Sequence, residues 1–314
     1  MNILPPKKLN KGDTIGVISM SHYVSDETIA KATEFIQNRG YNTYVHPQTK
    51  LRHHKQAGTI EDRLNALHDV FANPEIDAII VTSGGNRALH LLDHIDYELI
   101  KQNPKIFCGY SDTSALLNAF HAQTGLITFH GPDLHRLTHP TEDVNQHFDI
   151  FETVANGNLF QYDMDKSQII RQGTGEGLFV GGNLTLIQNM IKTKYLTDFK
   201  DKIVFIEDEK ETLWNLDRML LFFKRHGYFD DCAGIIFGGF SESVDYATGK
   251  TPFGYSLEDL IKEHCMSSDT DFPIITKAPF GHLGAMATFP IGAKASLSAQ
   301  DNQVTLELMQ VATK

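Results

Sequence analysis

The stretch Lys105-Ile-Phe-Cys-Gly-Tyr-Ser-Asp-Thr-Ser-Ala-Leu-Leu117 decides the fold, because a short apolar run enters it and a helical pattern leaves it. Ser111 falls at the bend between the two. A serine there has its hydroxyl lifted off the sheet edge, and the next peptide N–H lies at a helix N-terminus. The stretch therefore predicts strand, turn and helix, with Ser111 either as a nucleophile or as part of an ordinary helix cap.

Strand and helix patterns alternate on the N-terminal side of this bend. Residues 13–20, 41–45 and 78–82 form β-type runs, and two amphipathic helical stretches, capped by Ser25 and Thr59, lie between them. The first run is rich in β-branched residues and predicts a buried strand, and the third run is continuously apolar. This succession predicts a mostly parallel sheet with helices on both faces.

The second half repeats the mixture of strands and helices after a polar segment rich in His, Thr and Pro. We place a domain of residues 1–145 before a linker at 146–164, and a second α/β domain at 165–314 after it. The expected strands include 177–180, 202–206 and 233–237, and the expected helices 184–192, 212–226 and 256–264. Residues 293–298 and 303–308 predict an antiparallel hairpin.

Composition limits the classes of partner. The 314 residues include 28 Lys and Arg against 39 Asp and Glu, a net charge of −11. This balance disfavours nucleic acid, which needs a concentrated basic face. The three cysteines, Cys108, Cys232 and Cys265, are odd in number and widely spaced, which predicts buried thiols in a reducing compartment.

The N-terminus lacks the apolar core of a signal peptide, and no apolar run approaches the roughly 20 residues that span a bilayer. We therefore expect a soluble cytoplasmic protein with no membrane partner. His90 and His94 have a spacing that binds zinc on an α-helix, but neither an intervening glutamate nor an obvious third ligand accompanies them. We expect no metal and no cofactor.

A second turn with functional potential is Ser83-Gly84-Gly85-Asn86, which follows the strand at 78–82. Two glycines let the backbone turn sharply and approach a ligand closely, although a tight strand-to-helix turn needs them too. This turn and Ser111 both follow strands of one sheet, at the edge where open α/β sheets bind ligands. The sequence lacks the Gly-x-Gly-x-x-Gly pattern of a dinucleotide site.

A serine nucleophile needs a base, and the base needs an orienting carboxylate. Glu207 directly follows the strand at 202–206, and His282 follows a strand and Gly281. Each has an ordinary alternative, a solvated acidic loop for Glu207 and a turn histidine for His282. Together they complete the chain order Ser, Glu, His of the α/β-hydrolases. The N–H groups of Asp112 and Gly85 would then meet the oxyanion.

Six motifs, taken in order, resemble the LD-carboxypeptidase family of serine peptidases, which includes the microcin C immunity proteins. They are Gly84-Gly85-Asn86, Gly109-Tyr110-Ser111-Asp112-Thr113, Gly181-Gly182-Asn183-Leu184, Ile206-Glu207-Asp208, Leu216-Asp217-Arg218 and Phe280-Gly281-His282.

The resemblance implies a Ser111-Glu207-His282 triad, an oxyanion hole at Asp112 and Gly85, and no metal. It also implies a Rossmann-like N-terminal domain, a mixed α/β C-terminal domain, an active site between them, and a homodimer.

Compared with the two branches of the family, this chain shares some substrate-related features with each. Muropeptide LD-carboxypeptidases typically carry Arg-Gly-Gly-Tyr-Gly at the first glycine turn, whereas the Gly-Gly-Asn form of this chain is more similar to the immunity branch. The tryptophan that immunity proteins stack on the nucleotide base has no match, since Phe179 and Val180 precede Gly181 and the only tryptophan is Trp214.

The leading expectation is a serine carboxypeptidase that hydrolyses the L,D-peptide bond before the terminal D-alanine of murein tetrapeptide. The alternatives are hydrolysis of a peptidyl- or aminoacyl-nucleotide amide, and a non-catalytic small-ligand binding module. Asn86 and Arg87 are the expected substrate-binding residues. Arg218 is a second candidate for the substrate carboxylate, and we interpret it rather as a buried ion-pair partner.

Overall fold

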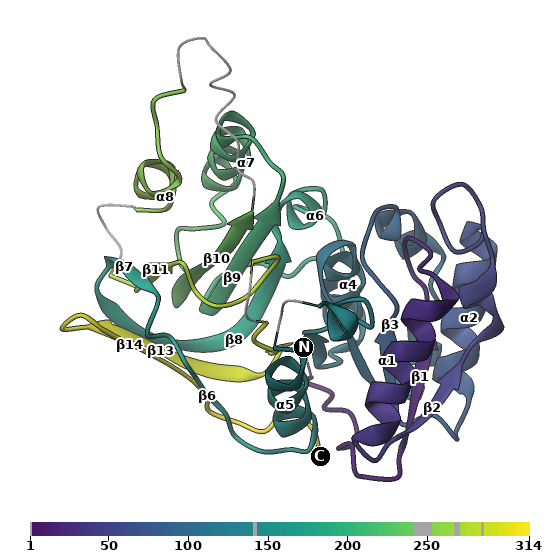
Figure 1. Ribbon diagram of the computed structural model, residues 1–314. Coiled ribbons are helices and arrows are strands. Elements are labelled where there is room, and N and C mark those ends of the chain that lie inside the picture. Colours follow the sequence, from purple (N-terminus) through teal and green to yellow (C-terminus); the bar gives the residue numbers. More distant parts are fainter. Residues whose placement is uncertain (1, 141–142, 242–252, 267–270, 284–285) are drawn as a thin grey trace.

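The computed structural model describes residues 2–140, 143–241, 253–266, 271–283 and 286–314. Its strands form two sheets that stand side by side (Figure 1). One has six strands in the order β12-β5-β4-β3-β1-β2, and the other has eight in the order β6-β14-β13-β8-β9-β10-β11-β7. Both sheets carry helices, so the chain is an α/β protein as expected.

The six-stranded sheet is parallel from β1 to β5 and antiparallel only at β12. Its strands are β1 (Thr14–Ile18), β2 (Asn42–Val45), β3 (Ala78–Val81), β4 (Ile106–Gly109), β5 (Thr128–His130) and β12 (Phe289–Ile291). The helices are α1 (Asp26–Asn38), α2 (Ile60–Ala72), α3 (Tyr97–Gln102), α4 (Ser114–Thr124) and α5 (Val144–Ala155), with short 3₁₀ helices η1 (Pro47–Lys50), η2 (Ala88–His94), η3 (Ser111–Thr113) and η4 (Arg136–Thr138).

The eight-stranded sheet is mixed. Its parallel centre runs β8-β9-β10-β11, and antiparallel pairs flank that centre on both sides. The strands are β6 (Gln161–Tyr162), β7 (Gln168–Arg171), β8 (Gly173–Asn183), β9 (Lys202–Glu209), β10 (Gly234–Ser241), β11 (Ile274–Thr276), β13 (Lys294–Gln300) and β14 (Gln303–Leu308). The helices are α6 (Leu184–Gln188), α7 (Leu213–Arg225) and α8 (Leu257–Cys265).

Local signals explain why the predicted helices form where they do. Thr59 and Asp62 make a reciprocal capping box at the start of α2, and the Ser25 side chain accepts from the Thr28 N–H at the start of α1. The hairpin predicted at the C-terminus is β13 and β14. All three cysteines are buried free thiols, as predicted.

Strand β12 joins the two halves of the chain. It lies between α8 and β13 in sequence but pairs with β5, so that Phe289 sits opposite His130. The ring of Phe289 stacks on Phe179 of β8 at 5.1 Å and meets Phe205 of β9 at 5.1 Å. This shared aromatic core fixes the two sheets against each other, because removing such rings from a core costs several kcal/mol.

Some element lengths differ from prediction. Strand β8 spans Gly173–Asn183 rather than 177–180, because β13 and β9 pair with it on both sides. Within this long strand Gly175 lets the Ala233 backbone approach, since a Cβ on Gly175 would lie 1.8 Å from the Ala233 carbonyl oxygen. Helix α6 is shorter than the predicted 184–192, ending at Gln188. The interval 146–164 holds most of α5 and all of β6, and the domain borders within it stay a prediction.

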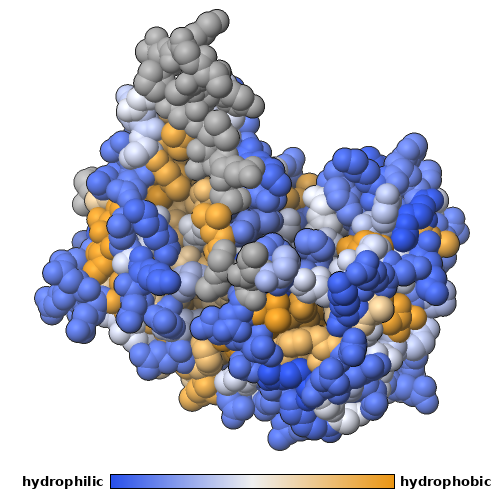
Figure 2. Space-filling view, viewed as in Figure 1, coloured by the Kyte–Doolittle hydropathy of each residue, from blue (hydrophilic) through white to orange (hydrophobic). Residues whose placement is uncertain are grey.

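On the face drawn in Figure 2 most of the surface is hydrophilic, and the two lobes part at the top. No helix within the described ranges is long and apolar enough to cross a bilayer.

Candidate active site

Ser111 occupies the strained bend that the sequence predicted. Strand β4 ends at Gly109, and η3 begins at Ser111 and leads into α4. The φ angle of Ser111 is +59°, in the left-handed region that costs an L-residue roughly 1–2 kcal/mol. Strain of this kind clusters at functional sites, and a serine nucleophile on a strand-to-helix turn adopts it. Ser111 is half-buried and therefore accessible.

The Gly84-Gly85 turn lies directly against Ser111. A Cβ on Gly84 would stand 2.7 Å from the Ser111 Cβ and 2.9 Å from its Oγ, so only glycine leaves the hydroxyl room. Gly85 is exposed with φ +136°, and its N–H makes no hydrogen bond in the described chain. The Asp112 N–H belongs to the first turn of η3, where N–H groups lack helical acceptors. One backbone donor thus follows Ser111 directly in the chain, and the other belongs to the turn that contacts Ser111.

Two buried carboxylates hold this turn in place. Asp112 accepts hydrogen bonds from the Ser21 hydroxyl and from the Ala88 N–H, the latter at 2.9 Å. Asp133 accepts from the N–H groups of Gly84 at 3.1 Å and Arg136 at 2.8 Å. Burial raises the pKa of both carboxyl groups, that of Asp133 to about 6, while these hydrogen bonds oppose the rise.

Glu207 and His282 meet at the eight-stranded sheet, where the segment after β11 passes β9 and β10. Glu207 lies within β9 and is fully buried, and His282 Nδ1 lies 2.5 Å from Glu207 Oε2. A bridge between Gly239 and Gly281 aligns the His282 segment with β10. Gly281 has φ +97°, and a Cβ there would lie 2.8 Å from the Glu207 Cβ. The glycine before His282 therefore lets the imidazole approach the carboxylate.

The charge of Glu207 decides the protonation of His282. Burial lowers the pKa of the imidazole, but the charge of Glu207, its hydrogen bond and the charges of Glu209 and Asp208 outweigh burial, so the pKa is raised. The second ring nitrogen, Nε2, lies 3.6 Å from Glu209 Oε2. An imidazolium at this position is therefore stabilised by carboxylates on both sides.

His282 reaches the half of the chain that carries Ser111. Its ring lies 5.1 Å from the ring of Tyr110, the residue before Ser111. Among the residues described, no hydrogen bond joins Ser111 to His282. Such bonds are often long without substrate and tighten when it binds.

Asp208 ties two of the sequence motifs together. It accepts from the Asn183 side chain at 2.9 Å and from the Thr185 N–H and hydroxyl at 3.0 and 2.8 Å. Burial and the neighbouring charge of Glu207 raise the pKa of Asp208 to about 6. The Asn183 N–H also donates to Ser114 Oγ at 3.2 Å, which links β8 to α4. This network sets the end of β9, where Glu207 stands, relative to the helix after Ser111.

The other residues singled out from the sequence make no hydrogen bond or ion pair with Ser111, Glu207 or His282 among the described residues. Asn86 accepts from the Gln56 side chain at 2.8 Å, and Arg87 is exposed with φ +76°. Arg218 is exposed on α7 and bonds to the Asn215 side chain, so its interpretation as a buried ion-pair partner is wrong. Trp214, at 49% exposure, starts the same helix.

The pair His90 and His94 belongs to η2, a 3₁₀ helix. With three residues per turn, positions i and i+4 do not share a face there, so the α-helical zinc spacing does not apply.

Two family models match the chain, the LD-carboxypeptidase N-terminal domain over residues 15–131 and the LD-carboxypeptidase C-terminal domain over residues 176–297. The chain belongs to the LD-carboxypeptidase family. It is accordingly a serine-type carboxypeptidase by family, and the two matched regions contain Ser111 and both of its candidate partners, Glu207 and His282.

Two relatives of this LD-carboxypeptidase span almost its whole length. The probable murein peptide carboxypeptidase of Bacillus subtilis is 32% identical, with 96% of this chain and 94% of the relative covered. The microcin C7 self-immunity protein MccF of Escherichia coli is 27% identical, covering 96% and 95%. A structure of MccF in complex with glutamyl sulfamoyl guanosine superposes with a TM-score of 0.87 at 26% identity, covering 98% of this chain and 99% of that one.

Sequence reasoning missed the carboxylates that position the LD-carboxypeptidase turns. Asp112 was expected to contribute its N–H, and its buried side chain holds Ala88 in addition. Asp133 follows the strand β5 by three residues, the same strand-end signal that pointed to Glu207, and that signal could have found it.

Proposed function

We propose that this LD-carboxypeptidase hydrolyses the L,D-peptide bond before the C-terminal D-alanine of murein tetrapeptide through a triad of Ser111, His282 and Glu207. The observation that carries the proposal is the 2.5 Å contact between His282 Nδ1 and Glu207 Oε2, formed against the residue that precedes Ser111. A base with an orienting carboxylate beside a strained serine is the arrangement that activates a hydroxyl.

The proposed reaction begins when Ser111 Oγ attacks the carbonyl carbon of the scissile amide. His282 Nε2 takes the serine proton, and Glu207 holds the tautomer and steadies the imidazolium. His282 returns that proton to the leaving nitrogen, so D-alanine departs and an acyl-serine ester remains. A water then attacks the ester with His282 again as base. The two steps consume one water and regenerate Ser111.

The N–H groups of Gly85 and Asp112 are the proposed oxyanion donors. Both belong to turns that touch Ser111, and the buried Asp112 and Asp133 side chains fix those turns. Donors held in place before the reaction need no reorganisation as the charge develops, and each is worth roughly 3 kcal/mol of barrier by analogy with other oxyanion holes.

A murein peptide is favoured over a nucleotide because no exposed aromatic ring stands just before Gly181, where a nucleotide base would stack. Phe179 is fully buried and stacks on Phe289 in the core. The murein name of the Bacillus subtilis relative points the same way. The Gly84-Gly85-Asn86 turn favours the second candidate, an aminoacyl-nucleotide amide of the kind bound in the MccF structure. A role in peptidoglycan recycling, a cytoplasmic location and a homodimer complete the proposal.

Hydrolysis of two substrates separates these candidates. Purified protein is incubated with murein tetrapeptide and, separately, with an aminoacyl sulfamoyl adenosine, and kcat/KM is compared. The proposal expects turnover of the tetrapeptide to exceed that of the nucleotide by at least about tenfold, a difference of 1.4 kcal/mol in barrier. Exclusive turnover of the nucleotide would replace the first candidate by the second, and binding without turnover of either would support a binding module.

A further inference from the structure

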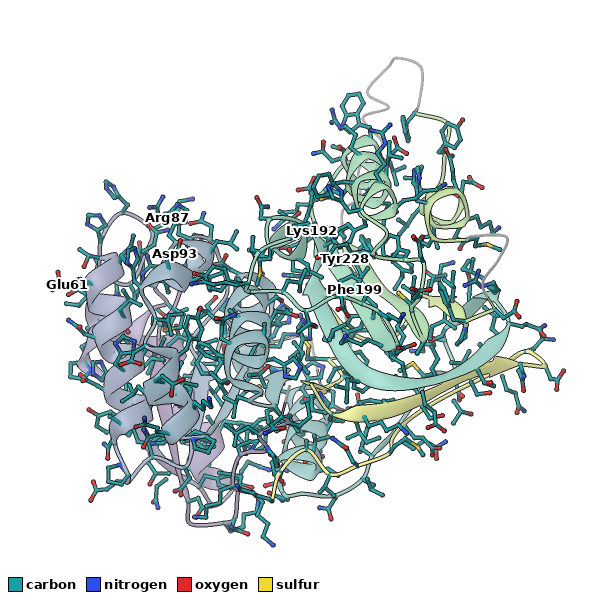
Figure 3. The ribbon with its side chains drawn as sticks, turned by 180° about the vertical axis from the view of Figure 1, so that it is seen from behind. Glu61, Arg87, Asp93, Lys192, Phe199 and Tyr228 are labelled. Atoms are coloured by element: carbon teal, nitrogen blue, oxygen red, sulfur yellow. The ribbon has the colours of Figure 1, made fainter. Side chains whose placement is uncertain are left out.

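A hollow of about 640 Å³ opens beside the Gly84-Gly85 turn. Its lining includes His53, His54 and Gln56 from the loop before α2, Glu61 and Arg63 from α2, and Arg87. Arg87 and Glu61 both belong to the N-terminal lobe in Figure 3. No residue of the proposed triad lines this hollow, so it is a separate feature next to the site.

Arg63 is a buried cation that lacks an anionic partner. The residue is 1% exposed, its Nε donates to the Thr59 carbonyl at 3.3 Å, and an Nη donates to the Met20 carbonyl at 2.9 Å. No carboxylate of the described chain lies within ion-pair distance of it. A buried charge is costly without a counter-charge, and a guanidinium has five N–H donors, more than the two carbonyls use.

The charges around the hollow leave it positive. Burial and the neighbouring charge of Arg87 lower the pKa of Arg63, whereas the charge of Asp112 raises it. The Asp112 carboxylate does not line the hollow and makes no ion pair with Arg63; its Oδ2 accepts from the Ser21 hydroxyl and the Ala88 N–H. Arg87 makes no ion pair in the described residues. Two guanidiniums against the single carboxylate of Glu61, in a chain of net charge −11, mark a local site for an anion.

The hollow is connected to the proposed oxyanion turn by a side-chain hydrogen bond and by the chain itself. The Gln56 side chain donates to Asn86 Oδ1 at 2.8 Å, which anchors the loop of His53 and His54 to the residue after Gly85. Arg87 follows directly. Arg87, which would contact an anion in the hollow, is therefore only two residues from Gly85, a proposed N–H donor to the reacting carbonyl oxygen.

We infer that this hollow binds a carboxylate of the peptide substrate, with Arg63 as the buried donor and Arg87 closing over it. The inference rests on the proposed function and deepens it, because it names the group by which the peptide is held. A tetrapeptide offers its C-terminal carboxylate and those of its acidic residues, and a planar guanidinium receives either in a bidentate manner.

Calorimetric binding to proteins that carry Ser111→Ala tests the inference without turnover. The probes are murein tetrapeptide, the same peptide amidated at its C-terminus, and the peptide amidated at its other carboxylates. Arg87→Gln and Arg63→Lys should weaken tetrapeptide binding by about 10- to 100-fold. One amidated peptide, the one that has lost the bound carboxylate, should bind both variants as it binds the parent, and so identify the source.

Arg52→Gln is the matched control. Arg52 belongs to the loop of His53 and His54, but its guanidinium packs over the Tyr23 ring and does not line the hollow. It should leave binding unchanged. If Arg63→Lys does not fold, Arg87→Gln decides alone. Unchanged affinity of Arg87→Gln for the tetrapeptide, or an equal loss of affinity for the tetrapeptide and both amidated peptides, would overturn the inference. Failure of the parent enzyme to release D-alanine would instead count against the proposed function, since the binding test needs no hydrolysis.

Discussion

His282 Nδ1 lies 2.5 Å from Glu207 Oε2, and the two residues are separated by 75 positions in the chain. Glu207 is buried within β9, and His282 follows Gly281 in the segment after β11. The contact gives the imidazole one orientation and leaves Nε2 as the nitrogen for proton transfer. Because Ser111 belongs to the other sheet, the proposed chemistry depends on how the two sheets are packed together.

The dependence of kcat/KM on pH should reveal the effect of the Glu207 carboxylate on the pKa of His282. Since the pKa of His282 is raised above its ordinary 6.5, the imidazole becomes neutral only above that pH, and kcat/KM should rise through a midpoint higher than 6.5. Glu207→Gln removes the charge but leaves the burial, so the midpoint should move to lower pH while the maximal rate falls by about 10,000-fold.

Glu211→Gln provides the control for that profile, because this carboxylate bonds to Asn215 instead. Its midpoint should match the parent protein. An unchanged or higher midpoint in Glu207→Gln would show that Glu207 does not govern the base, and wild-type rates would transfer its role to Asp208 or Glu209.

Backbone strain at Ser111 predicts a difference between two inactive variants. Ser111→Gly and Ser111→Ala both remove the nucleophile, but only glycine adopts φ +59° without strain. Urea unfolding should therefore give Ser111→Gly the larger free energy of unfolding, by roughly 1 kcal/mol. Neither variant should be labelled by a fluorophosphonate. Equal stabilities would mean that the bend carries no strain.

The contact between Gly84 and Ser111 is testable by a double-mutant cycle. In Gly84→Ala the new methyl group would meet the Ser111 side chain at 2.7 Å, which should destabilise the protein by roughly 1–3 kcal/mol. In a Ser111→Gly background that side chain is absent, and the Asp112 nitrogen at 3.6 Å is an ordinary contact. The same substitution should then cost less than about 1 kcal/mol. Identical costs in both backgrounds would place the clash elsewhere.

Asp133 should act on catalysis by positioning the Gly84 turn. Asp133→Asn exchanges one of two accepting oxygens for an amide donor that faces an N–H, so the side chain loses its hydrogen bond to either Gly84 or Arg136 and no longer clamps the turn from both. We expect kcat to fall by about 10- to 100-fold with a smaller change in KM. Asp143→Asn, which alters only the cap of α5, should keep the parent kcat. Equal kcat values for both variants would contradict a positioning role for Asp133.

The residues of the candidate site were predictable where a strand ends directly before them. Ser111 follows β4 closely, and a short apolar run with a polar residue after it was enough to select Glu207, although β9 continues past Glu207 to Glu209. His282 lies six residues beyond the end of β11 and was selected by the turn that carries Gly281. The parallel centre of each sheet followed from continuous apolar runs for the same reason.

Long-range contacts escaped prediction because no local pattern encodes them. The three residues of β12 are too few for a periodicity, and their pairing with β5 joins segments that the sequence assigned to different halves. Arg63 lies in an amphipathic helix, where an arginine is ordinarily solvated, and only the tertiary structure buries it.

Release of D-alanine from murein tetrapeptide, measured by mass spectrometry with the parent protein and Ser111→Ala side by side, tests the central claim most directly. The account predicts that the parent converts tetrapeptide to tripeptide and free D-alanine, and that Ser111→Ala slows this at least about 10,000-fold. Intact tetrapeptide with the parent protein, or equal release by both proteins, would contradict it.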